Sequence, residues 1–326
     1  MNIVILDGYT SNPGDLSWDG IARHGNLTVY EHTPAELTIE RAYEAEIVIS
    51  NKTALGTAEI NQLPKLRYIG LLSTGYNIVD LDAAKRRGIA VTNIPAYSTP
   101  SVAQLAFALL LELSSHVGEH SVSVRSGEWA RSRDFCYWKH PLVELSGKTF
   151  GIVGFGNIGR EIAKIAKAFS MIVVACGRPG TAGSAPSSET IFDGILVTSL
   201  ENVLSRSDVV SLHCPLFPET TGLINRETIA MMKRGAFLIN TARGGVINER
   251  DVAEALADGR LGGAGLDVLS TEPPRSDNPL LSAPNCVITP HIAWATREAR
   301  TRLICVLEEN LEAFLAGKPQ NIVPAK

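Results

Sequence analysis

Three glycines of the sequence GFGNIG, Gly154, Gly156 and Gly159, lie between an apolar run, 149–153, and a run with helical spacing, 160–169. A Gly-x-Gly-x-x-Gly motif between a strand and a helix is typical of a dinucleotide-binding fold. The first glycine permits a tight turn, the second lets a pyrophosphate approach the backbone, and the third lets helix and strand pack closely. The phosphates then lie at the helix N-terminus, where backbone amides are free. The motif therefore predicts a dinucleotide site, and the alternative is an ordinary turn that needs glycines.

Short β-branched runs alternate with stretches of helical spacing along the whole chain, which indicates a parallel α/β fold. At about 150 residues per domain, 326 residues predict two domains. Pro100 opens a long apolar helical run, and an amphipathic helical tail begins at Thr296. We predict one domain from residues 1–99 with 295–326 and a second from 100–294. The predicted strands are 2–6, 46–50, 68–72, 89–92, 149–153, 172–176, 209–213, 236–240, 265–268 and 287–289.

The charge and the cysteine content exclude several classes of protein. Thirty Lys and Arg against 34 Asp and Glu leave a net charge of -4, which argues against a nucleic-acid partner. The five cysteines are scattered and never spaced as Cys-x-x-Cys, which argues against disulfides and favours the cytoplasm. His213 and Cys214 have no third ligand at metal spacing, so we expect no metal site. The longest apolar stretch, 102–113, is too short to cross a bilayer, and the N-terminus lacks the basic region of a signal peptide.

The choice of cofactor depends on the second strand after the glycine motif. A carboxylate near its end usually binds the ribose 2′-hydroxyl of NAD, but residues 162–188 contain no Asp or Glu. The strand instead ends in Gly177-Arg178-Pro179, and Arg178 can pair with a 2′-phosphate. The sequence therefore predicts NAD(P)H and favours NADPH. Two alternatives stay open: Arg178 stacks on the adenine or faces solvent, and a hydrogen-bonding group in the loop 180–188 replaces the missing acid, so that NADH is used as well.

Three charged or titratable residues follow predicted strands of the second domain. Arg243 comes after the run AFLINTA, Glu272 after GLDV and His291 after the last strand. Ligands of an open α/β sheet bind at the carboxyl ends of the strands, so these side chains can converge. We expect a carboxylate or carbonyl partner for Arg243, and we expect Glu272 to favour the protonated form of His291, which makes a general acid near neutral pH. The alternatives are an internal salt bridge at Arg243 and a structural role for His291.

Several longer motifs of the chain occur together in one family. GFGNIG, HCPLFPETTGLI, MMKRGAFLINTARGG, GAGLDV, EPP, NPLL and TPHIAW lie between Phe150 and Trp294, and LLSTGYNIVDLDAAKRRGIAVTNIPAYSTPSVAQ precedes them. In these motifs the sequence resembles the D-isomer-specific 2-hydroxyacid dehydrogenase family over nearly its whole length. The segments STGYNIVD, GEWARSRDFCYW and HIAWAT are most similar to the glycerate dehydrogenases of that family, which are also called hydroxypyruvate reductases.

The resemblance implies a fold and a set of site residues. The fold would be two Rossmann-like α/β domains with parallel sheets, a flavodoxin-like substrate domain and a dinucleotide-binding domain, separated by a cleft. Arg243 would bind the substrate carboxylate and carbonyl oxygen, His291 would donate the proton, and Glu272 would orient His291. The backbone at Ser73, Thr74 and Gly75 would hold the substrate carboxylate, and Trp294 would line the pocket. The other positions that match cofactor contacts are Asn157, Ile158, Cys214, Pro215, Thr241 and Asp267.

The resemblance also implies a reaction. Hydride would pass from NAD(P)H to the carbonyl carbon of a small 2-oxo acid while His291 protonates the oxygen, giving a D-2-hydroxy acid. Hydroxypyruvate is the expected substrate, together with glyoxylate. The alternatives are another 2-oxo acid such as pyruvate, and a dinucleotide-sensing, corepressor-like binding protein built on the same fold. The helix after Pro100 and the segment 128–138 resemble the dimer arm of the family, which implies a homodimer.

Overall fold

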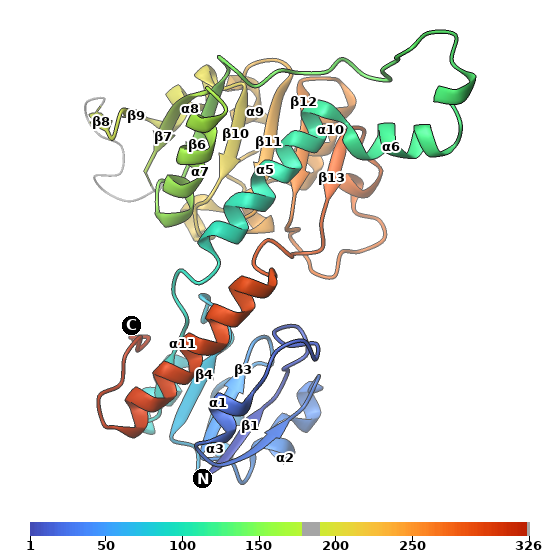
Figure 1. Ribbon diagram of the computed structural model, residues 1–326. Coiled ribbons are helices and arrows are strands. Elements are labelled where there is room, and N and C mark those ends of the chain that lie inside the picture. The colour runs from blue at the N-terminus through green and yellow to red at the C-terminus, as the bar shows by residue number, and fades with distance from the viewer. Residues whose placement is uncertain (178–189, 325–326) are drawn as a thin grey trace. The chain divides into compact units, whose positions relative to one another are not determined.

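The chain divides into two compact units in the computed structural model, which describes residues 1–177 and 190–324. The first unit is Met1–Ser98 with Ala295–Lys326, and the second is Thr99–Trp294. The first unit therefore combines the blue N-terminal residues and the red C-terminal helix of Figure 1. Each unit contains a sheet of parallel strands, which confirms the predicted α/β class.

The first unit is built around a parallel sheet with helices on both faces. Its elements are β1 (Asn2–Ile5), α1 (Asp19–Ala22), β2 (Asn26–Val29), α2 (Thr38–Ala42), β3 (Ile47–Ser50), α3 (Thr57–Gln62), β4 (Tyr68–Leu71), α4 (Leu81–Arg86), β5 (Ala90–Thr92) and α11 (Arg297–Leu315). The strand order, β2-β1-β3-β4-β5, is that of flavodoxin-like folds. Helix α11 packs on β4 and α1 and buries Leu303, Leu307 and Leu311. Helices α2, α3 and α4 enclose a separate apolar cluster with residues of the sheet.

The second unit is built around a longer sheet. Its strands are β6 (Thr149–Val153), β7 (Ile172–Cys176), β8 (Thr190–Phe192), β9 (Ile195–Val197), β10 (Val209–Leu212), β11 (Ala236–Asn240), β12 (Leu261–Leu266) and β13 (Cys286–Ile288). The order is β13-β12-β11-β10-β6-β7-β9-β8, and β8 is antiparallel to β9 at the edge. From β9 to β12 this is the order of a doubly wound dinucleotide-binding fold, whose direction of winding reverses between β6 and β10. Ligands bind outside the carboxyl ends of the strands at such a reversal.

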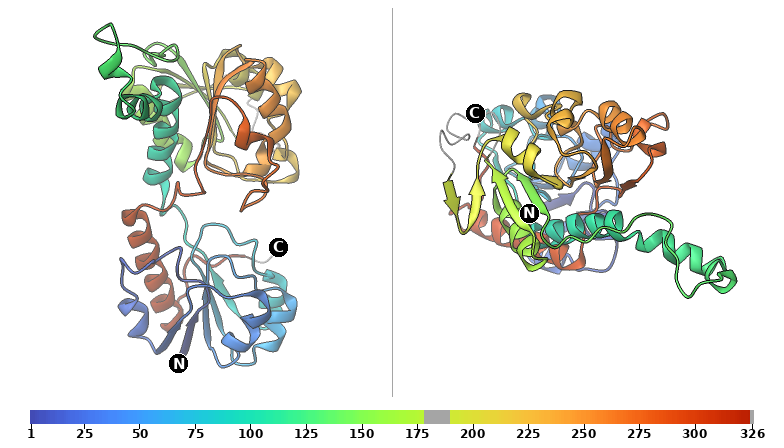
Figure 2. Two further views of the ribbon diagram at one scale, coloured as in Figure 1. Left: turned by 90° about the vertical axis from the view of Figure 1, so that its right-hand side faces the viewer. Right: turned by 90° about the horizontal axis from the view of Figure 1, so that it is seen from above.

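Helices cover both faces of the second sheet, as Figures 1 and 2 show. Their bounds are α5 (Thr99–Ser115), α6 (Val117–Arg125), α7 (Asn157–Ala168), α8 (Leu200–Arg206), α9 (Arg226–Met231) and α10 (Glu249–Ala257). Helices α5 and α7 enclose one core with one face of the sheet, and α8, α9 and α10 enclose another core with the opposite face. Helix α6 and the chain that follows it extend away from the second sheet (Figure 2, right). Within the described ranges no single helix is long and apolar enough to cross a membrane, and α5 and α6 meet that test only as a pair bent by 58°.

Most predicted strands coincide with observed ones to within a residue, but three strands were not predicted. Strand β2 is short and mostly exposed. Strands β8 and β9 are three residues each and form a hairpin around Asp193-Gly194, a turn signal that the prediction missed. Strand β12 begins at Leu261 rather than at the predicted residue 265, because its glycines hide the pattern. A Cβ on Gly263 or Gly265 would lie 3.0 Å from Leu113 or 2.8 Å from Leu109 of α5, so these glycines let α5 approach the sheet.

Candidate active site

The glycine turn between β6 and α7 has the geometry that a dinucleotide requires. Gly154 has a φ of +100°, and a Cβ there would lie 2.7 Å from the backbone of His213 and Cys214. A Cβ on Gly159 would lie 2.5 Å from the carbonyl oxygen of Gly154, whereas a Cβ on Gly156 would meet no atom within 4 Å. The first and third glycines therefore serve the packing of the turn. The space beside Gly156 adjoins the first amides of α7, where a pyrophosphate fits.

The first residues of α7 and the loop after β10 frame this space. Asn157 is exposed and Ile158 is half-buried at the start of α7. Cys214 is buried against Gly154, and Pro215 is exposed. His213, the neighbour of Cys214, has its Nε2 2.7 Å from Ser211 Oγ, and its Nδ1 is enclosed without a partner among the described residues. Burial lowers the pKa of His213 to about 3, so this ring is neutral at physiological pH.

The turn after β11 presents Thr241 and Arg243. Asn240 closes it, because its Oδ1 accepts from the amide of Ala242 at 3.0 Å and its Nδ2 donates to the carbonyl of Arg243 at 3.0 Å. Thr241 is buried, and its hydroxyl has no hydrogen-bond partner in the part of the chain that the structure describes. An enclosed, unpaired hydroxyl beside a predicted cofactor site fits a polar ligand.

Arg243 is exposed, and its guanidinium donates to the carbonyl of Ala242 at 2.7 Å. The expected carbonyl partner is therefore present. Within residues 1–177 and 190–324, no acid forms an ion pair with Arg243, so no salt bridge among the described residues explains this arginine. The positive charge remains available to a carboxylate from outside the chain.

Gly244 joins the Arg243 turn to the segment that carries Glu272. A Cβ on Gly244 would lie 1.9 Å from the carbonyl carbon of Leu269 and 2.3 Å from the amide nitrogen of Ser270. Only glycine permits this approach of two backbones. The contact holds the residue after Arg243 against the chain that precedes Glu272.

Glu272 and His291 are hydrogen-bonded to each other. The Nδ1 of His291 lies 2.6 Å from Glu272 Oε2, and Glu272 Oε1 accepts from the amide of Leu269 at 3.2 Å. Because a carboxylate accepts, Nδ1 carries the donated hydrogen, and the opposite nitrogen, Nε2, has no partner among the described residues. The side chain of His291 is 28% exposed and that of Glu272 is 36% exposed. The pair therefore presents one ring nitrogen to a ligand while the carboxylate fixes the ring.

Asp267 fixes the backbone around His291. Its buried carboxylate accepts from the Thr289 hydroxyl at 2.6 Å and from the amides of Ile292 and Ala293 at 2.8 Å each. Its carbonyl accepts from the amide of His291 at 2.8 Å, and His291 has a φ of +56°. Burial raises the pKa of Asp267 and its hydrogen bonds oppose that shift. The structure thus gives Asp267 a direct role in holding the His291 turn.

Glu249, at the start of α10, holds the loop on which Glu272 lies and had no sequence signal. Its Oε1 accepts from the amide of Ser270 at 2.7 Å, and its Oε2 accepts from Asn278 Nδ2 at 2.9 Å. The two contacts flank Glu272 on both sides in the sequence. A glutamate in the first turn of a helix is common for helix-dipole reasons alone, so this role was not visible in the sequence.

The loop Ser73–Gly75 lies in the first unit, after β4. Asn93 Nδ2 donates to the carbonyl of Thr74 at 2.7 Å, and the amide of Ile94 donates to the carbonyl of Ser73 at 3.0 Å. The carbonyl sides are therefore occupied, whereas the amides of Ser73, Thr74 and Gly75 have no acceptor within the described residues. Three successive free amides form a site for an anion.

Two further predicted residues remain. Trp294 is half-buried at the last position of the second unit. Arg178, like the loop 180–188, lies outside the described residues.

Comparisons with known proteins agree with this geometry. Residues 107–293 match the family model for the D-isomer specific 2-hydroxyacid dehydrogenase, NAD binding domain. The hydroxypyruvate reductase of Blautia hydrogenotrophica is 48% identical over 326 residues, 99% of each chain. The glycerate dehydrogenase of Methylorubrum extorquens is 42% identical over 295 residues, 90% of each chain. A solved acyclic imino acid reductase in complex with NADPH and D-Arg is 32% identical, with a TM-score of 0.84 over 99% of this chain and 100% of that chain.

Proposed function

Because the chain belongs to the D-isomer-specific 2-hydroxyacid dehydrogenase family, we propose that its preferred substrate is hydroxypyruvate and its product D-glycerate. The chain is an NAD(P)-dependent oxidoreductase that reduces a 2-oxo acid to a D-2-hydroxy acid. Likeness to a hydroxypyruvate reductase over 99% of both chains supports the narrower assignment. In the structure, the observation that best supports this reaction is the 2.6 Å hydrogen bond between Glu272 Oε2 and His291 Nδ1.

The residues of the site have separate roles in this proposal. His291 donates the proton on Nε2 to the carbonyl oxygen, and Glu272 stabilises the imidazolium before the transfer. Arg243 binds the substrate carboxylate and the carbonyl oxygen, which withdraws charge from the carbonyl carbon. When bound, the reduced nicotinamide supplies the hydride that this carbon accepts. The product is therefore an alcohol with one added hydride and one added proton.

We assign the cofactor and the substrate carboxylate to different units. We assign the cofactor to the second unit, because the NAD-binding family model covers 107–293. Gly154, Gly156 and Gly159 with Asn157 and Ile158 hold the pyrophosphate, and Cys214, Pro215, Thr241 and Asp267 lie along the cofactor. We assign the substrate carboxylate to the amides of Ser73–Gly75 in the first unit, with Trp294 as a wall of the pocket.

NADPH is the cofactor that we propose. The absence of any Asp or Glu from 162 to 188 removes the carboxylate that would repel a 2′-phosphate, and Arg178 can pair with that phosphate. A carboxylate at this position is what usually selects NADH.

The deciding experiment is the initial rate of reduced-nicotinamide oxidation by the purified chain. Hydroxypyruvate, glyoxylate and pyruvate are each tested with NADPH and with NADH, and the configuration of the product is determined. Highest kcat/KM with hydroxypyruvate and NADPH is the expected result. A preference for NADH contradicts the role of Arg178 but not the reaction, and a preference for pyruvate contradicts the substrate. No turnover with any pair would favour a dinucleotide sensor.

The glycine motif yields a prediction that separates cofactor binding from folding. In Gly156→Ala the new methyl enters open space in the protein, so the Tm stays close to that of the wild type while dinucleotide affinity falls at least about tenfold, because the methyl occupies the place of the pyrophosphate. In Gly159→Ala the methyl meets the Gly154 carbonyl, so the Tm itself falls. Thermal unfolding and NADPH fluorescence titration measure the two effects. Unchanged affinity in Gly156→Ala would contradict the placement of the pyrophosphate.

We also propose that the chain forms a homodimer through the arm 117–142 and works in the cytoplasm. The arm extends from the second unit, and its exposed side chains include Trp129, Phe135 and Trp138, of which Phe135 is 88% exposed. Several large apolar side chains exposed on one segment are typical of a protein interface. Sedimentation equilibrium should give twice 35.0 kDa for the wild type and 35.0 kDa for Phe135→Asp with Trp138→Asp. A monomeric wild type would contradict the dimer.

All five cysteines are free, which supports a reducing compartment such as the proposed cytoplasm.

A further inference from the structure

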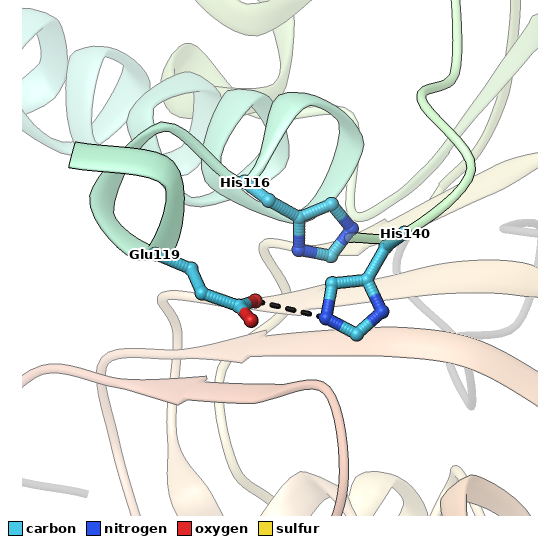
Figure 3. A group of neighbouring side chains, drawn as sticks. All are labelled: His116, Glu119 and His140. Atoms are coloured by element: carbon cyan, nitrogen blue, oxygen red, sulfur yellow. Dashed lines mark ion pairs between the residues drawn. The ribbon is translucent and has the colours of Figure 1, made fainter. Parts of the chain in front are cut away.

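Two histidines and a glutamate meet at the base of the arm, outside the site described above. Figure 3 shows His116, Glu119 and His140 with their polar ends directed toward one another. The Nε2 of His140 lies 2.9 Å from Glu119 Oε2, and one ligand atom from each residue lies within 4.8 Å of the other two. The rings of His116 and His140 face each other with centroids 4.7 Å apart. None of the catalytic or cofactor roles uses these residues.

The three side chains come from separate parts of the chain. His116 is the single residue between α5 and α6 and has a φ of +50°, which helps turn the chain by 58°. Glu119 lies three residues later, in the first turn of α6 and on the same side. His140 lies on the chain that returns from the arm. The cluster therefore joins the point where the arm leaves the second unit to the point where it returns.

His120 holds the two ends of the arm together without being a member of the cluster. Its Nδ1 donates to the carbonyl of His116 at 2.8 Å, and its Nε2 accepts from the amide of Lys139 at 3.2 Å. Both ring nitrogens of His120 are thus used. One bonds to the backbone of His116, which belongs to the cluster, and the other to the backbone of Lys139, which precedes His140. Glu112 adds a further brace, because its carboxylate accepts from the amide of Gly118 at 3.1 Å. The backbone on both sides of the cluster is held before any ligand binds.

A cavity of about 480 Å³ lies beside the cluster. His116, Glu119 and His140 line it together with apolar residues that include Leu113, Val143 and Phe237. A ligand bound by the three polar side chains would thus be accessible from the cavity on one side.

We propose that His116, Glu119 and His140 bind one divalent transition-metal ion of the Zn²⁺ class. Two imidazole nitrogens and one carboxylate oxygen form a donor set that zinc commonly takes, with a remaining position for water. In a tetrahedral site with bonds of about 2.1 Å, ligand atoms lie about 3.4 Å apart. No pair of ligand atoms, all within 4.8 Å, then has to approach by more than about 1.4 Å, and the Glu119–His140 pair, at 2.9 Å, opens slightly. The side chains of Glu119 and His140 are 44% and 49% exposed and can rotate. The ion closes the base of the arm.

This site departs from the expectation of no metal, which considered cysteine spacing and the His213-Cys214 pair. A second cluster of His24, Glu308 and Glu312 meets the same distance limit in the first unit. It is the weaker candidate, because Glu308 already pairs with Arg23 and only one imidazole is present. It provides a matched control.

The test is titration of the metal-free full-length chain with Zn²⁺ by calorimetry and with Co²⁺ by visible absorption. The wild type should bind one ion per chain, and Co²⁺ should show the intense bands of a four- or five-coordinate ion. His140→Gln and His116→Asn should each lower the affinity more than about 100-fold, since even loss of an outer partner of a metal ligand costs about 10–100-fold. Asparagine is chosen at His116 because it tolerates the left-handed backbone.

The controls separate this site from unspecific binding and from unfolding. His24→Gln should bind the ion as the wild type does, and the variants should keep the metal-free Tm and their rate of 2-oxo acid reduction. Glu119→Gln, which changes only an exposed side chain, is a second variant should either histidine variant fail to fold. Absence of saturable binding by the wild type overturns the proposal. So does binding that persists in all three variants of the cluster or is lost in His24→Gln.

Discussion

In His291→Asn, kcat for hydroxypyruvate reduction falls by about 10²–10⁴-fold, the usual contribution of a positioned general acid. The substitution removes the ring nitrogen that donates the proton. Asparagine tolerates the φ of +56° at this position, so the turn held by Asp267 is kept. Steady-state kinetics measure kcat, and fluorescence titration with NADPH measures cofactor affinity, which should change little.

His32→Asn is the matched control for this result. His32 is exposed in the first unit and lies against the ring of Tyr9, far in sequence from every site residue. Its substitution should leave kcat unchanged. If His291→Asn retained kcat within a factor of about ten, another group would have to donate the proton, and the role of the Glu272–His291 pair would be wrong.

In Gly244→Ala, the free energy of unfolding of the second unit falls by about 1–3 kcal/mol or more. The added methyl would lie 1.9 Å from a backbone carbonyl carbon, and neither backbone can rotate away as a side chain can. The segments of Arg243 and Glu272 are forced apart, so kcat/KM falls as well. Urea denaturation followed by circular dichroism measures the stability, and the hydroxypyruvate assay measures the activity.

The adjacent glycine provides the comparison. A Cβ on Gly245 would first meet the terminal carbons of the Leu216 side chain at 3.0 Å, which can move. Gly245→Ala should therefore cost less than about 1 kcal/mol. Equal losses in the two variants would show that the close approach at Leu269 does not govern the stability of this turn.

The sequence predicted the central strands well because they are buried on both faces. Strands such as β6, β7 and β11 are continuous apolar runs bounded by turn residues, and these are visible without any knowledge of their neighbours. Strand β2 lies at the edge of its sheet, and its four residues are exposed or only partly buried, so its pattern is weak. Where tertiary contacts rather than burial decide an element, the local sequence carries little signal.

The residues of the site likewise fall into those that the local sequence reveals and those that depend on tertiary contacts. The glycine motif and the strand-end residues were found because each stands at a fixed offset from a predicted strand. The role of Glu249, the close approach of Gly244 to Leu269, and the cluster of His116 with His140 all depend on segments that meet only in the folded chain. No residue spacing encodes such contacts.

The first unit is built from two separate stretches of the chain, so the order of synthesis affects the order in which the two units can fold. The second unit, Thr99–Trp294, has its full sequence before Ala295 is translated, whereas the first unit lacks α11 until Arg297–Leu315 have been translated. Helix α11 brings Leu303, Leu307 and Leu311, all fully buried, to the sheet of residues made first. The sheet made first on the ribosome thus keeps one face uncovered until α11 has been made, whereas the domain made in the middle can fold before that.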